Sequence, residues 1–267
     1  MRILIINGSA HKGNTWKLVE QAKAELWELD SKTEIKEIHL IEEKILFCTG
    51  CSNCFRLGHE KCPHYSIIGK IIEEMEDADG IIFASTTYNM TETALLKNLF
   101  DHLCFMLHRP HFFHSKALII TTTGGVGGNK AAKSIKSMLR GIGFNRCYCF
   151  SRPTFSWNAY KPDSRTLGIL KKKVNKFYRD VKSKKLHSPA TILLMPYNLF
   201  RGMSLAYAPG TEYETKDGVY WTEEERKNKV YDLHVKVPFY KRIVGHIFYG
   251  IGKMAGKMKR MRVTYKK

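Results

Sequence analysis

Four cysteines within fifteen residues form the first pattern that could carry chemistry: Cys48, Cys51, Cys54 and Cys62. The first three are separated by two residues each, and this spacing turns successive sulfur atoms toward one centre. A fourth thiolate farther along completes the ligand set of a [4Fe–4S] cluster. Zinc also binds four thiolates, but its sites more often use two separated C-x-x-C pairs. The pattern favours a cluster over zinc, and a redox-active thiol pair or loop cysteines without function are the alternatives.

The segment Gly8–Thr15 is the second such pattern, because it leaves an apolar strand and enters a helix. Backbone N–H groups and the helix dipole favour an anion at such a junction. The spacing nearly matches the phosphate loop G-x-x-x-x-G-K-[ST], but Asn14 stands where the lysine belongs. Neutral donors from Ser9, Asn14 and Thr15 therefore suit a single terminal phosphate. A helix that is merely capped after a tight turn is the alternative.

Two further loops follow later strands of the chain. Ser85–Asn89 mixes hydroxyl groups with Tyr88, whose ring can stack on a planar ligand. Thr121–Gly128 holds four glycines in five residues, which lets the backbone approach a ligand closely. Taken singly, each loop also fits an ordinary turn. Taken together, the three loops predict the walls of one pocket.

Apolar runs typical of strands alternate with helical spacings along the first 187 residues. The strands and helices that they predict must position these loops. We expect strands at 2–7, 34–41, 80–84, 117–120 and 146–150, and helices at 14–29, 67–75, 93–107, 130–139 and 167–181. This alternation predicts an α/β fold, a doubly wound five-stranded parallel sheet with ligands at the carboxyl ends of its strands. We expect Cys104, Cys147 and Cys149 to pack in the core.

The three loops resemble those of the NADPH-dependent FMN reductase family over about residues 1–187. The matching motifs are Gly8-Ser9 with Gly13-Asn14-Thr15, Ser85–Asn89 with Leu96–Asp101, and Thr122–Gly125. The resemblance implies a flavodoxin-like sheet of order 2-1-3-4-5, an FMN phosphate in the first loop, and the isoalloxazine ring between the other two. The FMN-binding residues it implies are Ser9, His11, Lys12, Asn14, Thr15, Ser85, Thr86, Thr87, Tyr88, Asn89, Thr122, Thr123, Gly124 and Gly125. The family usually has Ser-Pro-Val-Tyr in the second loop, where this chain has Thr86-Thr87 in place of Pro-Val.

The cysteine run resembles that of the iron–sulfur flavoproteins, a branch of the same superfamily. In that branch a [4Fe–4S] cluster exchanges electrons with FMN, usually across a homodimer. The resemblance therefore implies that Cys48, Cys51, Cys54 and Cys62 are metal ligands and that the chain forms a homodimer.

The function that follows is an FMN-dependent oxidoreductase that takes electrons from NADH or NADPH and passes them to an unidentified acceptor. A flavin needs positioning more than acid–base groups, and we expect no catalytic side chain. The alternative is an electron carrier, similar to a flavodoxin or an iron–sulfur flavoprotein, without a small-molecule substrate of its own.

Charge is concentrated at the end of this 267-residue chain, whose net charge is +19. Residues 1–187 carry +11, residues 188–232 carry −2, and residues 233–267 carry +10 with no acidic side chain. Such a segment favours an acidic partner such as lipid headgroups, or it is a solvated tail. Basic charge alone gives only non-specific nucleic-acid binding, so we expect no specific nucleic-acid partner.

Residues 188–267 form the predicted C-terminal extension. We expect strands and turns over 190–232, followed by a basic amphipathic helix over Phe239–Met261. That helix suits a membrane interface, or it docks on its own domain or on a dimer mate. With 43% hydrophobic and 26% charged residues, the chain is not a disordered protein. It has no apolar run of membrane-spanning length and no secretory pattern at Met1, so a cytoplasmic protein with peripheral membrane contact is expected.

Overall fold

The computed structural model describes residues 1–157 and 159–258. Its centre is a five-stranded parallel sheet of order β2-β1-β3-β4-β5, the order that the sequence resemblance implied. The strands are β1 (Arg2–Asn7), β2 (Glu34–His39), β3 (Gly80–Thr86), β4 (Lys116–Thr123) and β5 (Arg146–Pro153). Strands β1, β3 and β4 are buried almost throughout, because helices cover both faces of the sheet.

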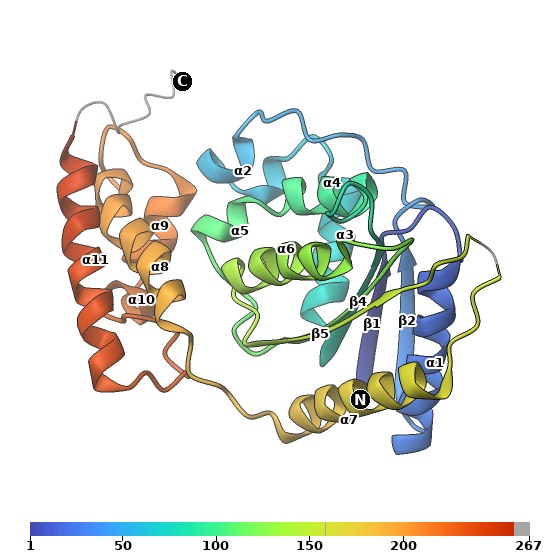
Figure 1. Ribbon diagram of the computed structural model, residues 1–267. Coiled ribbons are helices and arrows are strands. Elements are labelled where there is room, and N and C mark those ends of the chain that lie inside the picture. Colours follow the sequence, from blue (N-terminus) through green and yellow to red (C-terminus); the bar gives the residue numbers. More distant parts are fainter. Residues whose placement is uncertain (158, 259–267) are drawn as a thin grey trace.

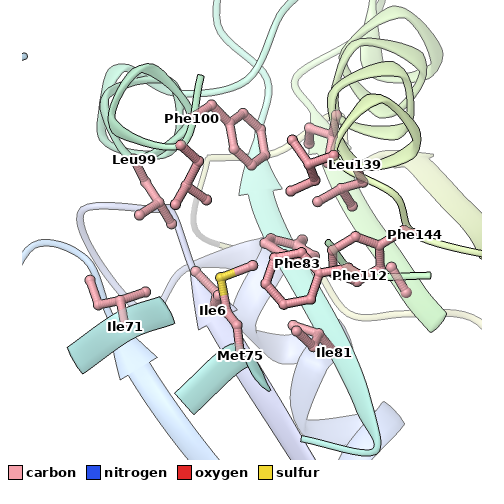
Figure 2. Close-up of a cluster of buried hydrophobic side chains, with 14 of the residues drawn as sticks. Ile6, Ile71, Met75, Ile81, Phe83, Leu99, Phe100, Phe112, Leu139 and Phe144 are labelled. Atoms are coloured by element: carbon pink, nitrogen blue, oxygen red, sulfur yellow. The ribbon is translucent and has the colours of Figure 1, made fainter. Parts of the chain in front are cut away.

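Helices α1 (Asn14–Leu29) and α7 (Ser164–Ser183) cover one face of the sheet. The other face carries α3 (Tyr65–Glu76), α4 (Ala94–His102), α5 (Phe105–His108) and α6 (Gly128–Gly141). Figure 2 shows how side chains from this second layer, such as Leu99 and Leu139, enclose Ile81 and Phe83 of β3. The alternation of element types along residues 1–183 is as predicted, and the helix expected over 93–107 is divided into α4 and α5.

The segment after β2 contains the four clustered cysteines and two short helices, α2 (Asn53–Arg56) and η1 (His59–Lys61). In Figure 1 it lies above the second helical layer, between the sheet and the C-terminal extension. This location follows from the topology, because the carboxyl end of β2 opens on the same edge of the sheet as those of β1 and β3.

The extension is helical, and the strands expected over 190–232 are wrong. It contains α8 (Thr191–Met203), η2 (Ser204–Tyr207), α9 (Lys216–Thr222), α10 (Glu224–Lys227) and α11 (Phe239–Lys257). The buried residues of α8 have helical spacing, but two of them, Asn198 and Arg201, are polar. The spacing of the apolar side chains alone therefore does not reveal the helical period. Pro196 inside α8 conceals it further, because proline ordinarily interrupts a helix.

A third core cluster holds the extension together, with Leu194, Tyr197 and Trp221 among its residues and Phe113 contributed by the first part of the chain. Helices α8 and α11 run side by side at the left of Figure 1. Helix α11 occupies most of the range predicted for the basic amphipathic helix, and Arg260 and Met261 lie outside the described residues. Among the described residues, no helix combines the length and apolar character needed to cross a bilayer.

Candidate functional site

A cavity of about 330 Å³ opens where β1, β3, β4 and β5 end. Parallel strands end at one edge of a sheet, so the loops after these four strands converge there. The walls are Ser9, His11, Gly13, Asn14, Thr15, Thr86, Thr87, Tyr88, Thr122, Thr123, Gly124, Thr154, Phe155, Ser156 and Trp157. The volume lies within the range of sites that bind small molecules and cofactors.

Ten of the fourteen residues predicted to bind FMN line this cavity, and four do not. The Lys12 ammonium lies over the Trp16 ring, 5.1 Å from its centroid. The Ser85 hydroxyl is buried and accepts a hydrogen bond from the Thr93 N–H (3.1 Å). Asn89 is exposed in a tight turn at a φ of +50°, and Gly125 borders a neighbouring hollow. Direct contact of any of the fourteen with FMN stays a prediction.

Hydrogen bonds join the first loop to its neighbours. The Thr86 N–H donates to the Ser9 hydroxyl (3.1 Å), and the hydroxyls of Thr15 and Thr122 are 2.6 Å apart. Helix α1 begins at Asn14 without a side-chain cap, so backbone N–H groups of its first turn are left for a ligand. The loop therefore offers backbone donors to an anion, while its side chains mainly hold the walls together.

A fourth loop after β5, residues 154–157, was missed by the sequence analysis. Its position depends on Asn14, whose amide donates to the Ser156 carbonyl (2.7 Å) instead of remaining free for a phosphate. Phe155 has a φ of +46°, which is unusual for an aromatic residue, and its N–H donates to the Gly124 carbonyl (3.1 Å). Two aromatic residues directly after the last strand, Phe155 and Trp157, were the available pattern.

The wall residues of the cavity include one with an unsatisfied polar group and three with open aromatic faces. The Thr87 hydroxyl is buried and finds no hydrogen-bond partner in the part of the chain that the structure describes. Buried polar atoms are nearly always paired, so this one indicates a ligand with a hydrogen-bonding edge. Tyr88 and Phe155 are exposed, and Trp157 is 96% exposed, which leaves ring faces available for stacking. The residues present therefore fit a flat heteroaromatic ring that carries an anionic tail.

A second hollow, of about 520 Å³, adjoins the cavity and shares Thr123 with it. Lys130 at the start of α6 and Arg152 near the end of β5 line this hollow. The Lys130 ammonium lies 3.5 Å from the Met90 sulfur, and the Arg152 guanidinium donates to the Ser151 carbonyl. Neither cation has a carboxylate partner among the described residues, so both are available to an anionic ligand.

The cysteine segment is attached to α4 by polar contacts. The Cys48 N–H donates to the Asn98 side-chain oxygen (3.2 Å), and the Asn98 amide donates to the carbonyls of Ile45 and Leu46. The Nε2 of His102 also lies 2.9 Å from the Leu46 carbonyl, so it must be the donor. The other nitrogen, Nδ1, then faces the Cys62 sulfur at 4.0 Å as an acceptor.

The four clustered thiols do not converge on one point in this structure. Cys48 and Cys51 are exposed, whereas Cys54 and Cys62 are half-buried. The Cys54 thiol shares a hydrogen bond with Cys104, which raises the pKa of Cys54 and lowers that of Cys104. Burial raises the pKa of Cys62. Across residues 1–157 and 159–258, no three His, Cys, Asp or Glu side chains form a group that could hold a metal ion.

Cys104 therefore has a different environment from the one expected. It is half-buried and pairs with Cys54, fifty positions earlier in the chain, instead of packing among apolar side chains. The donor chemistry of the cysteine run suits an iron–sulfur cluster, but among the described residues no three of its thiols form a group that could hold a metal ion.

The C-terminal extension holds the other end of the cysteine segment. The guanidinium of Arg109 donates to the Cys54 carbonyl (2.6 Å) and forms an ion pair with Asp217 of α9. Asp217 also bonds to the Nδ1 of His108 (2.8 Å). Arg109 is 7% exposed and Asp217 13% exposed, so their charges interact with little screening by water.

A family model described as NADPH-dependent FMN reductase matches residues 1–160, more than half of the chain. The chain belongs to this family. Membership confirms the resemblance found in the three loops and the predicted class of enzyme, an NAD(P)H-dependent FMN oxidoreductase.

Proteins similar in sequence to this chain include iron–sulfur flavoproteins. One, from Clostridioides difficile, is 32% identical over 58% of this chain and 68% of its own length. Another, from Archaeoglobus fulgidus, is 38% identical over 38% of this chain and 48% of its own length. This chain thus spans only about half of the second relative.

Solved structures share the fold of this FMN reductase chain. An FMN-dependent NADH-azoreductase from Bacillus anthracis, solved in complex with FMN, superimposes with a TM-score of 0.51. The match covers 68% of this chain and 99% of the azoreductase, at 14% identity. At that identity the comparison supports the flavodoxin-like architecture alone.

Proposed function

We propose that the cavity at the carboxyl ends of the strands binds FMN and that the chain uses it to carry electrons from a nicotinamide cofactor to an acceptor. The observation that carries this proposal is the buried, unpartnered Thr87 hydroxyl in a cavity walled by the three family loops. When bound, FMN accepts a hydride from the reduced nicotinamide and releases electrons to the next acceptor.

The chain's own groups would position the cofactor. The first-turn N–H groups of α1 would bind the phosphate, because no side chain of the described residues caps them and they lie at the positive end of the helix dipole. The Thr87 hydroxyl would donate to an acceptor on the edge of the flavin ring. Tyr88 and Trp157 would cover the ring and exclude water from it. These roles need no acid–base pair, in agreement with a site rich in hydroxyl and backbone groups.

The neighbouring hollow is our candidate for the nicotinamide cofactor, because it adjoins the cavity and offers two cations to a pyrophosphate. Changing Arg152 or Lys130 to alanine should raise the KM for NADPH about fivefold each, the usual contribution of a partly exposed ion pair, and leave kcat nearly unchanged. Arg146→Ala is the matched control, since Arg146 lies at the opposite end of β5. Unchanged KM values in steady-state assays would rule the hollow out.

An iron–sulfur cluster on the cysteine segment remains a separate proposal. It is supported by the four-thiol donor set and by the names of the relatives, and the lack of a metal-holding group of three side chains among the described residues counts against it. The homodimer is a prediction that follows from the resemblance, and the cytoplasmic location is a prediction from the sequence pattern, while the acceptor is unidentified.

The first experiment is an absorption spectrum of protein purified without oxygen, with iron and sulfide assays on the same sample. Flavin bands that bleach rapidly when NADPH or NADH is added are the expected result. Slow bleaching would favour the electron carrier. A protein that stays colourless with added FMN would contradict the proposal, and about four irons per chain would support the cluster.

A further inference from the structure

Seven large apolar side chains are exposed on α11, and six of them share one face. They are Phe239, Tyr240, Ile243, Ile247, Ile251, Met254 and Met258, which directly follows the helix, and they are between 41% and 78% exposed. From Tyr240 onward, spacings of three and four residues place the other six in one stripe. A contiguous apolar stripe of this length marks an interaction surface rather than ordinary scattered exposure.

The opposite face of α11 is already occupied by α8. A side chain placed at Gly252 would come within 2.3 Å of the Leu199 carbonyl, and one at Gly256 within 2.9 Å of the Met203 carbonyl. Gly245 is likewise buried against α8 and the segment after α10. The glycines therefore bring the two helices close together and fix which side of α11 faces outward. That outward side carries the apolar stripe.

A row of exposed basic groups runs beside the stripe. Arg242, His246, Lys253 and Lys257 follow one another at spacings of four, seven and four residues, and so share a flank of the helix. Residues 233–267 contain ten lysines and arginines and no aspartate or glutamate. The apolar surface is thus bordered by cations without any acidic side chain on its own segment.

We propose that this face of α11 docks on an anionic lipid surface, with the helix lying in the plane of the headgroups. An apolar face flanked by lysine and arginine is the arrangement that binds such an interface. The apolar side chains insert among the lipid acyl chains, while lipid phosphates and carboxylates neutralise the cations. A symmetric pair of chains would bring two basic rows together, and like charges at an interface oppose association. The positive charge beside the apolar stripe therefore favours lipid over a second copy.

The test is co-sedimentation of the full, FMN-loaded chain with vesicles rich in phosphatidylserine and with vesicles of phosphatidylcholine alone. The expected result is binding to the anionic vesicles that weakens as salt is added. The triple variant Ile243→Gln, Ile247→Gln, Met254→Gln should bind them at least about tenfold more weakly. The double variant Lys253→Glu, Lys257→Glu should lose the preference for anionic lipid.

Two controls match these variants. Ile41→Gln removes an apolar side chain of similar exposure from the loop after β2 and should bind as well as the unchanged chain. Lys133→Glu with Lys172→Glu makes the same charge change on exposed positions of α6 and α7 and should retain most of the binding. Circular dichroism melting curves verify that each variant folds.

Equal binding by the unchanged chain and the triple variant would overturn the proposal, and so would absence of binding to anionic vesicles. Light scattering tests whether a second copy of the chain covers this face instead of lipid. A dimer that becomes a monomer in the triple variant, with no vesicle binding by either protein, would assign the face to a second copy and reject the lipid.

Discussion

At the scale of single residues, the Thr87 hydroxyl is the most direct probe of the cavity. Thr87→Val keeps the shape of the side chain and removes its donor. We expect the Kd for FMN to rise about fivefold to tenfold, since a neutral hydrogen bond contributes about 1 kcal/mol. Titration of flavin fluorescence measures the change.

Thr33 supplies the matched control for that experiment. Its hydroxyl is also buried and unpartnered within the described residues, but it lies just before β2, at the opposite edge of the sheet. Thr33→Val should leave the Kd for FMN unchanged. An equal loss of affinity in both variants would mean that the Thr87 effect is one of general stability and not of contact.

Glu37 of β2 gives a pH dependence at the same scale. Burial alone would raise the pKa of Glu37, but hydrogen bonds from Lys23 (2.6 Å) and His39 (3.1 Å) lower it below its ordinary 4.5. Between that lowered value and about 4.5 the unfolded chain binds more protons than the folded one. The free energy of unfolding should therefore fall as the pH falls through this window.

Glu37→Gln should flatten this part of the acid profile, as measured by urea unfolding at several pH values. At neutral pH the variant should lose about 1 kcal/mol at most, because the ion pair is partly exposed. Glu20→Gln is the control, since Glu20 also bonds to Lys23 (2.9 Å) but is more exposed. An unaltered slope in Glu37→Gln would assign the acid sensitivity to other carboxylates.

At the scale of elements, the glycines of α11 illustrate how one residue type serves two purposes. Gly252 faces α8, and Gly250, two positions earlier, meets nothing within 4 Å. Gly252→Ala should destabilise the extension by about 1–3 kcal/mol, because the new methyl group has no room. Gly250→Ala should stabilise α11 by about 0.5–1 kcal/mol through helix propensity. Urea unfolding of the two variants should thus shift in opposite directions, and equal shifts would contradict the packing described.

At the scale of the whole molecule, Asp217 connects the extension to the cysteine segment through Arg109. Asp217→Asn leaves a buried guanidinium without its counter-charge, and we expect a loss of about 3 kcal/mol of stability. Amide hydrogen exchange should become faster over residues 48–62, while FMN affinity should be nearly unaffected because the cavity lies at other strand ends.

Glu223→Gln tests whether that effect is specific. Glu223 also belongs to the extension, but its pair with Arg226 is local and exposed. Its loss should change stability by less than about 0.5 kcal/mol and leave exchange in the cysteine segment unchanged. If both variants loosened residues 48–62 equally, the Arg109–Asp217 pair would not be the connection.

The sequence by itself determined the α/β alternation, the helix bounds of α1 and most walls of the cavity. Each of these depends on the side chains of one short segment: a buried strand is continuously apolar, and an amphipathic helix repeats every three or four residues. The strand order came from the resemblance of the three loops to a known family. Because parallel strands end at the same edge of a sheet, the sequence alone was enough to assign the loops after β1, β3 and β4 to one pocket.

The tertiary structure alone decided which distant side chains meet. Asn14 holds the loop after β5, and Cys104 pairs with Cys54. Arg109 joins α2 to α9. Helix α8 escaped prediction because its buried face includes Asn198 and Arg201, whose amide and guanidinium groups donate to the distant carbonyls of Val230 and Lys229. Such partners depend on how whole layers pack, and local periodicity carries no information about contacts made across tens or hundreds of residues.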